Sequence, residues 1–295
     1  MARLAALVGV AFGLGARDPG CAAGPERLLE AGPPPCLRAP ASAGAWMELL
    51  RPPRSPSALA AAAVAVEALE AALAPHLALR RRAVVVGGDH SLALGTWRAL
   101  ARARGPLGLL WVDAHLDAHT PRTTPSGALH GMPLACLLGT EGGVLEPLCP
   151  PYPALDLERV CVLGARSFEP PEARLLARLG VRVLGMGEVV SRGLAACWAE
   201  ALERVAQGPY GVSVDLDAVD PDQAPGVGTP EPGGLDGEEL VRALAGLRAD
   251  PELGAVELME YHPGRDREGR TLALLQRLLC AALPWGEEGT GDGWG

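Results

Sequence analysis

The sequence of 295 residues contains no lysine, no isoleucine and no asparagine. Without lysine the chain cannot form a lysine Schiff base, act as a pyridoxal-phosphate enzyme or build a Walker-type phosphate loop. Aromatic residues make up only 4% of the chain, so its core must consist mostly of Leu, Val and Ala. The three missing residues all use A/T-rich codons, and we infer a GC-biased gene in which some substitutions reflect base composition rather than function.

A surplus of positive charge is missing as well. The formal net charge of −9 leaves no basic excess to displace counterions, which predicts that nucleic acid is not a partner. No apolar run of membrane-spanning length is free of turn signals, so no membrane span is expected. Residues 1–15 are apolar enough to mimic a signal peptide, but the turn residues that follow favour a first strand.

The seven cysteines include no Cys-x-x-Cys pair, so neither a zinc knuckle nor a thioredoxin motif is indicated. An odd number of scattered cysteines is typical of free thiols in a reducing compartment. We therefore expect unpaired, buried thiols, with Cys136 and Cys161 in the core, and a cytoplasmic location.

Short apolar segments alternate with helical patterns along most of the chain. This alternation predicts a three-layer α/β/α fold with a mostly parallel sheet of roughly eight strands. With no repeat or composition break, we expect a single domain over residues 1–284 and a disordered tail over 285–295. The three arginines at 80–82 are expected at a solvated helix end or in a subunit contact. Strands are expected at 4–12, 83–86, 107–112, 160–163, 181–184, 211–214 and 253–259, and helices at 25–31, 58–74, 92–103, 132–138, 170–179, 194–207, 235–247 and 267–283.

Alternating acidic and histidine residues follow the apolar run 107–112, in the order Asp113, His115, Asp117. In an extended chain alternate side chains point the same way, so these three can converge just past a strand end. Carboxylates combined with a neutral imidazole suit Mn²⁺, Zn²⁺ or Fe²⁺ better than Ca²⁺. The alternative interpretation of this stretch alone is a solvated polar strand end.

Two further strand ends carry the same residue types. One delivers His90 within Gly-Gly-Asp-His-Ser, and the other delivers Asp215 and Asp217 within Ser-Val-Asp-Leu-Asp. Ligands bind at the carboxyl ends of parallel strands, where all of these residues are expected. Six such side chains would serve a pair of metal ions bridged by shared carboxylates.

In this order the motifs resemble those of the ureohydrolase family, which includes arginases, agmatinases and formimidoylglutamases. The similarity begins near residues 15–25 and continues to Met-Glu-Tyr-His-Pro at 259–263, and residues 123–133 are most similar to the substrate loop of arginases. The resemblance implies a hydrolase with two Mn²⁺ per chain that cleaves the guanidinium of L-arginine, a small-molecule substrate, to L-ornithine and urea. It also implies a homotrimer or homohexamer.

The resemblance also implies roles for particular residues. His130 would shuttle a proton, Glu260 would pair with the substrate guanidinium, and Asp117 would complete the catalytic set, with Thr229 beside the substrate. An imidazole can protonate the leaving amine near neutral pH, and a carboxylate is a planar fork that matches a guanidinium. One Mn²⁺ would be held by His90, Asp113, Asp117 and Asp215, and the other by His115, Asp113, Asp215 and Asp217.

The chain departs from arginases at the amino-acid end of the substrate. Arginases usually carry Asn where this chain has His119 and Ala128, and Asp where it has Glu169. His119 can still donate to a carboxylate, Ala128 cannot, and Glu169 keeps a charge for an ammonium group. With Thr124 and Ser126, these residues form the predicted substrate site. Two alternatives stay open: another guanidino-substrate hydrolase, such as an agmatinase or guanidinobutyrase, and a non-catalytic metal-binding homologue.

Overall fold

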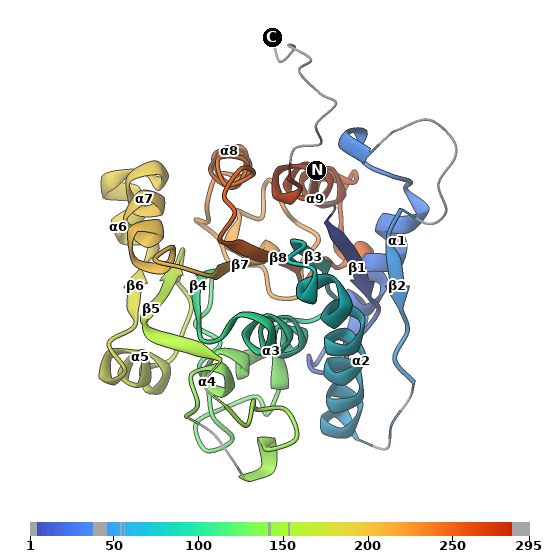
Figure 1. The fold of residues 1–295 in the computed structure, drawn as a ribbon. Helices are drawn as coiled ribbons and strands as arrows, with labels where there is room; N and C mark the ends of the chain where they lie inside the picture. Colours follow the sequence, from blue (N-terminus) through green and yellow to red (C-terminus); the bar gives the residue numbers. More distant parts are fainter. Residues whose placement is uncertain are drawn as a thin grey trace.

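The computed structural model describes residues 5–37, 46–53, 55, 57–140, 143–152 and 154–284. Within them, eight strands form one sheet in the order β2-β1-β3-β8-β7-β4-β5-β6, and every pairing is parallel (Figure 1). The predicted α/β/α fold with a parallel sheet is confirmed, whereas the predicted tail lies outside the described residues. The strands are β1 Ala6–Val10, β2 Glu48–Leu50, β3 Ala83–Val86, β4 Leu107–Val112, β5 Leu155–Leu163, β6 Arg182–Leu184, β7 Tyr210–Asp215 and β8 Leu253–Met259.

The helices cover both faces of this sheet (Figure 1). Side chains cap the starts of two of them: Ser57 accepts from Ala60 N–H at the start of α2, and Asp236 accepts from Glu239 N–H at the start of α8. Among the described strands and α-helices, β2 and α6 were not predicted, because these segments are too short to show a clear hydrophobic period. The α-helices are α1 Gly24–Glu30, α2 Ala58–Ala78, α3 Ala93–Arg104, α4 Pro133–Leu137, α5 Pro170–Arg178, α6 Met186–Arg192, α7 Leu194–Val205, α8 Gly237–Ala245 and α9 Arg270–Ala282.

The central strands are buried on both faces. In β3, Val85 packs in the hydrophobic cluster that includes α2 and α3, whereas Val84 and Val86 pack in the cluster that includes α7, α8 and α9. Two covered faces explain why these strands are continuous apolar runs rather than alternating patterns. The polar strand ends are therefore conspicuous against an apolar sheet.

By length and composition alone, α2 is long and apolar enough to cross a membrane, a test that core helices of soluble proteins also pass. In this fold it packs against α3, and its buried Glu70 forms ion pairs with Arg98 at 3.2 Å and Arg102 at 3.0 Å. The absence of a membrane partner stays a prediction.

The prediction of unpaired cysteines is wrong for four of the seven. Cys36 is bonded to Cys280 on α9, and Cys136 on α4 is bonded to Cys149. The Cα atoms lie 5.7 Å and 4.9 Å apart, within the range of a disulfide. The first pair is separated by 244 residues, so only the folded chain brings its members together. Three thiols stay free and buried: Cys21, Cys161 and Cys197.

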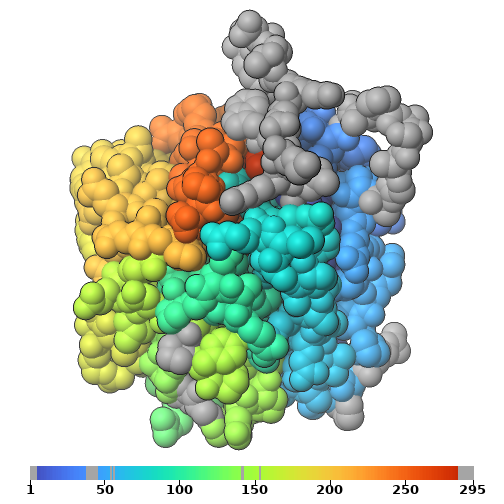
Figure 2. Space-filling model, viewed as in Figure 1, coloured from blue at the N-terminus to red at the C-terminus, as the bar shows by residue number. Residues whose placement is uncertain are grey.

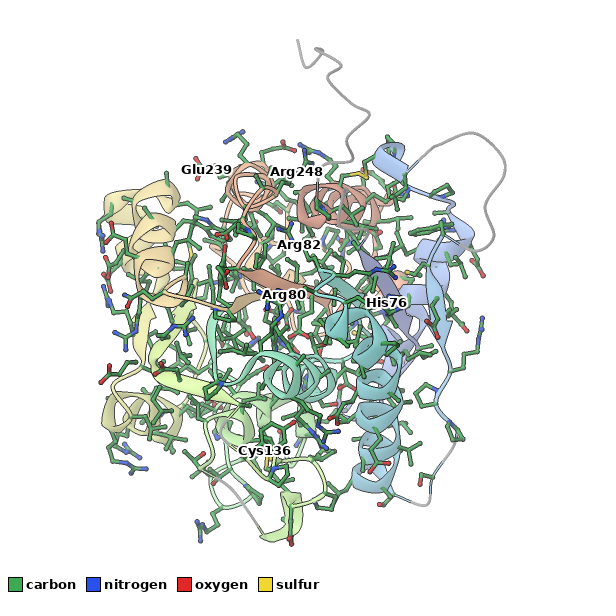
Figure 3. All side chains as sticks on the ribbon, in the orientation of Figure 1. His76, Arg80, Arg82, Cys136, Glu239 and Arg248 are labelled. Carbon is green, nitrogen blue, oxygen red and sulfur yellow. A yellow bond between two sulfur atoms is a disulfide. The ribbon has the colours of Figure 1, made fainter. Side chains whose placement is uncertain are left out.

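The prediction of a solvated arginine cluster is wrong for Arg82, which is buried immediately before β3, whereas Arg80 is exposed. Both residues are labelled in Figure 3. The Arg82 guanidinium crosses to the segment that follows α8, which lies beside the residues near 80 in Figure 2. It thereby ties the end of α9 to the start of β8. Its carbonyl acceptors, at 2.9–3.3 Å, are those of Leu247, Arg248, Asp250, Leu253 and Ala282.

Replacing Arg82 with Met should lower the free energy of unfolding by about 3 kcal/mol or more, because it removes charge-assisted hydrogen bonds to buried carbonyls. Urea denaturation followed by circular dichroism measures this change. The matched control Arg80→Met, at an exposed position, should change it by no more than about 0.5 kcal/mol. Equal, small effects of the two substitutions would contradict the structural role of Arg82.

Candidate active site

The predicted ligands meet at the carboxyl ends of β3, β7 and β4, and Glu260 joins them from the end of β8, which lies between β3 and β7. The sheet is parallel, so the residues that follow these strands emerge at one edge. There they border a cavity of about 450 Å³. The cavity wall includes His115, Asp117, Asp215, Asp217, His130 and Glu260, whereas His90 and Asp113 are fully buried behind it.

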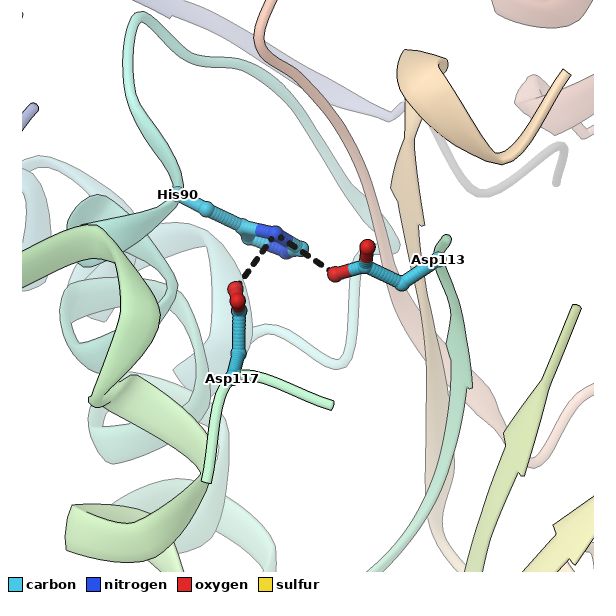
Figure 4. A group of neighbouring side chains, drawn as sticks. All are labelled: His90, Asp113 and Asp117. Atoms are coloured by element: carbon cyan, nitrogen blue, oxygen red, sulfur yellow. Dashed lines mark ion pairs between the residues drawn. The ribbon is translucent and has the colours of Figure 1, made fainter. Parts of the chain in front are cut away.

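His90 lies at the centre of a first group of ligands (Figure 4). Its Nδ1 atom is 3.3 Å from Asp113 Oδ2, 3.2 Å from Asp117 Oδ2 and 3.1 Å from Asp215 Oδ2. Within the described part of the chain this buried nitrogen makes no hydrogen bond. Three carboxylate oxygens and one ring nitrogen therefore converge on a single point.

His115 gathers a second group. Its Nδ1 atom is 3.4 Å from Asp113 Oδ1 and 3.1 Å from Asp217 Oδ2. Asp113 thus belongs to both groups, with one carboxylate oxygen turned toward each histidine. Asp215 borders the same space, and its other oxygen accepts from Asp217 N–H at 2.8 Å. The two candidate ion-binding positions therefore share a carboxylate.

The electrostatics of this cluster favour bound positive charge. Burial raises the pKa of Asp117 to about 6 and that of Asp215 well above its ordinary value, and neighbouring carboxylates add to both shifts. Burial lowers the pKa of His90, but the surrounding carboxylates outweigh it and raise this pKa well above the usual range. Four buried aspartates so close together stay ionised together only if cations compensate them.

The donor set fits divalent metal ions. His90 Nε2 lies 2.8 Å from Ser213 Oγ, which itself donates to Glu257 Oε1 at 2.7 Å. In a neutral His90 that donates through Nε2, Nδ1 carries a lone pair aimed at three carboxylates. Such an arrangement is repulsive unless a cation lies between them. Oxygen and imidazole ligands of this kind suit Mn²⁺ and related ions.

Three supporting residues were not predicted from the sequence. Trp111 donates from Nε1 to Asp113 Oδ2 at 2.8 Å, and its ring stacks on His90 with centroids 4.2 Å apart. Ser213 and Glu257 hold the far side of His90 from within β7 and β8. A sequence signal existed for the last two, because a serine and a glutamate are unusual inside buried apolar strands.

His130 and Glu260 form a hydrogen-bonded pair that borders the cavity beside the two ligand groups. His130 Nδ1 lies 2.9 Å from Glu260 Oε1, which also accepts from His90 N–H at 3.0 Å. The buried thiol of Cys21, another residue not predicted from the sequence, donates to Glu260 Oε2 at 3.0 Å. Burial lowers the pKa of His130, but the hydrogen bond and charge of Glu260, helped by Asp117, raise it to about 10. Hydrogen bonds from His90 and Cys21 thus hold the Glu260 carboxylate in place, with the His130 imidazole beside it.

Two of the four non-glycine residues with a positive φ angle among the described residues lie at this site. Asp117 and Glu260 adopt φ angles of +47° and +65°, which side-chain-bearing residues rarely do. Glu260 is fixed there by a hydrogen bond from its N–H to Gly88 O at 2.8 Å. Any side chain at Gly88 would collide with the carbonyl of Phe12, so only glycine allows the two loops this approach. With these backbone conformations, the carboxylates of Asp117 and Glu260 border the cavity.

In the predicted substrate loop, the hydroxyls of Thr124 and Ser126 accept hydrogen bonds from N–H groups of the same loop. Thr124 Oγ1 accepts from Gly127 N–H at 3.0 Å, and Ser126 Oγ accepts from Ala128 N–H at 3.1 Å. Ser126, Ala128 and Thr229 border the cavity, whereas Thr124 is not among the residues that line it. Thr124 therefore shapes the loop.

His119 and Glu169 both border the cavity, but they bind each other. His119 Nε2 lies 2.9 Å from Glu169 Oε2 and 3.2 Å from Glu172 Oε2, and its Nδ1 lies 3.1 Å from Thr123 Oγ1. Both ring nitrogens are thus occupied, which leaves His119 no free proton for a substrate carboxylate. Burial raises the pKa of Glu172 to about 8.

Comparisons with known proteins identify the family of this chain. The arginase of Brevibacillus brevis is 39% identical over 202 residues, which are 68% of each chain, and that of Agrobacterium fabrum is 33% identical over 291 residues, which are 93% of this chain and 89% of that one. A crystal structure of Bacillus subtilis arginase superposes with a TM-score of 0.86 at 29% identity, covering 97% of this chain and 100% of that one. The model of the arginase family matches residues 3–283. The chain therefore belongs to the arginase family and is a ureohydrolase, a hydrolase that acts on guanidino C–N bonds.

Proposed function

We propose that this protein is a binuclear manganese enzyme that hydrolyses L-arginine to L-ornithine and urea. The observation that carries the proposal is the position of Asp113, whose two carboxylate oxygens face His90 and His115 at 3.3 Å and 3.4 Å. A buried carboxylate between two histidines, with three more aspartates around it, is suited to bridging two cations. His90, Asp113, Asp117 and Asp215 would hold one Mn²⁺, and His115, Asp113, Asp215 and Asp217 the other.

The chemical problem is that a guanidinium carbon is a poor electrophile, because three nitrogens share its positive charge. Two bound divalent cations would supply the charge that lowers the pKa of water toward neutrality. The residues of the chain supply the rest. Glu260 offers a carboxylate to the planar guanidinium, and its contacts to Cys21 and His90 keep that carboxylate in place.

His130 is placed to protonate the departing amine. Its Nδ1 is engaged by Glu260, so its Nε2 is the atom left for the substrate. When the C–N bond breaks and the carbon takes a water oxygen, the amine that leaves must gain a proton. An imidazole that shares Glu260 with the guanidinium is within reach of that nitrogen and can supply it.

Urea release by the purified protein with Mn²⁺ should be highest for L-arginine when L-arginine, agmatine and 4-guanidinobutyrate are compared by kcat/KM. The three substrates share the guanidinium end and differ in the carboxylate and ammonium groups, and the chain of 4-guanidinobutyrate is one carbon shorter. The comparison of L-arginine with agmatine therefore isolates recognition of the carboxylate at the mouth of the cavity. Faster turnover of agmatine or 4-guanidinobutyrate would instead assign an agmatinase or guanidinobutyrase. A protein that binds Mn²⁺ but hydrolyses none of the three would indicate the non-catalytic homologue.

The cytoplasmic location, the homotrimeric or homohexameric assembly and the absence of a nucleic-acid partner stay predictions.

A further inference from the structure

The mouth of the cavity is strongly acidic. Besides the metal-ligating aspartates, its wall carries Asp18, Glu169, Glu172, Glu231 and Glu260. A substrate that carries a carboxylate would be repelled here unless a cation meets it.

The residues predicted to bind that carboxylate are poorly placed for it. His119 is held by Glu169 and Glu172, and Ala128 has no polar side chain. The hydroxyls of Thr124 and Ser126 lie 3.3 Å apart, so one can donate to the other while both accept from loop N–H groups. At most one hydroxyl proton of this loop is left for a ligand.

The positively charged side chain of Arg17 lies beside the predicted substrate loop. It follows β1, borders the cavity and donates from an Nη atom to Ser126 O at 3.3 Å. Its segment is fixed against the substrate loop, because Gly15 O accepts from Leu129 N–H at 2.7 Å and from His130 N–H at 3.2 Å. The Arg17 guanidinium therefore lies beside the loop that lacks carboxylate donors.

Arg17 is also the cation that remains available. Among the described residues it has no acidic partner, and a single contact to a carbonyl uses one of its five N–H donors. The other arginine that borders the cavity, Arg265, is paired with Asp18 at 2.7 Å and donates to Gly228 O. A guanidinium with free donors is suited to binding a carboxylate through two parallel hydrogen bonds.

We propose that Arg17 binds the carboxylate of the substrate and thereby selects guanidino acids over guanidino amines. This inference rests on the proposed function, because it assumes that the guanidinium end lies at the metal site. Arg17 would take over the task for which His119 and Ala128 are unsuited, and Glu169, which borders the same cavity, would meet the ammonium of an amino acid. L-Arginine presents both groups, 4-guanidinobutyrate only the carboxylate and agmatine only the ammonium.

The test is Arg17→Gln, with kcat and KM measured on all three substrates in the presence of Mn²⁺. The KM for L-arginine and 4-guanidinobutyrate should rise by about tenfold or more, with little change in kcat, since a charge-assisted hydrogen bond to the bound ground state is lost. The KM for agmatine should stay the same or fall. Arg17→Lys, which keeps the charge, should recover part of the loss, whereas the matched control Arg51→Gln, at an exposed arginine paired with Glu26, should change nothing.

A second measurement makes the inference independent of turnover. Calorimetric binding of L-ornithine and of putrescine, which differ by the carboxylate, should show that Arg17→Gln weakens only L-ornithine. Equal affinities in the wild type and the variant, or an equal rise of KM for all three substrates, would overturn the role of Arg17. A wild type that hydrolyses no guanidino substrate would overturn the proposed function instead, and the binding comparison would still decide on Arg17.

Discussion

Replacing His130 with Ala is expected to lower kcat on L-arginine by on the order of a hundredfold or more, with both metal ions retained. His130 borders the cavity and binds Glu260, but it lies outside both ligand groups. Its loss removes the proton donor for the departing amine and leaves the aspartates in place. Steady-state urea release gives kcat, and elemental analysis of the purified variant gives the metal content.

The matched control is His76→Ala. His76, labelled in Figure 3, is on the last turns of α2, which leads to the start of β3, whereas the predicted ligands follow the carboxyl ends of the strands. This variant should keep the wild-type kcat. A His130→Ala protein that lost its metal ions would show that His130 acts as a ligand. An unchanged kcat would show that His130 is not the proton donor for the departing amine.

Replacing Asp113 with Ala is expected to remove both metal ions and abolish activity. Its oxygens face both histidines, so a single substitution removes one ligand from each ion-binding position. The remaining carboxylates, which are already hard to ionise together, would bind cations more weakly. Elemental analysis after gel filtration should find fewer metal ions than one per chain, against two in the wild type as proposed.

Two variants make the result for Asp113 specific. Asp222→Ala, at an exposed position outside the ligand groups, should keep both ions and full activity. Asp117→Ala removes a ligand from the His90 group alone and should weaken mainly one ion. Two tightly bound ions in Asp113→Ala would contradict a bridging carboxylate, and circular dichroism would show whether each variant is folded.

Much of the fold and the ligand cluster could be predicted from the sequence because both depend on local periodicity. The bounds of β3, β4 and β8 agree with the expected apolar runs. Asp113 directly follows β4, at the strand end where the apolar run stops and a ligand was expected. Parallel strands then place all such ends at one edge of the sheet. The resemblance to the family suggested the roles proposed for His130 and Glu260, which their neighbours in sequence do not reveal.

Tertiary structure alone decided the features that join distant segments. The contact of Arg17 with Ser126, the hydrogen bond of Arg82 to Leu247 and the pairing of Cys36 with Cys280 link residues that are 109, 165 and 244 positions apart in the sequence. Local sequence carries no record of such approaches, because they depend on how helices and loops pack around the finished sheet. Local motifs in the sequence therefore predicted which side chains gather at the base of the cavity. Contacts between distant segments decided which side chains at its mouth are free to bind a ligand.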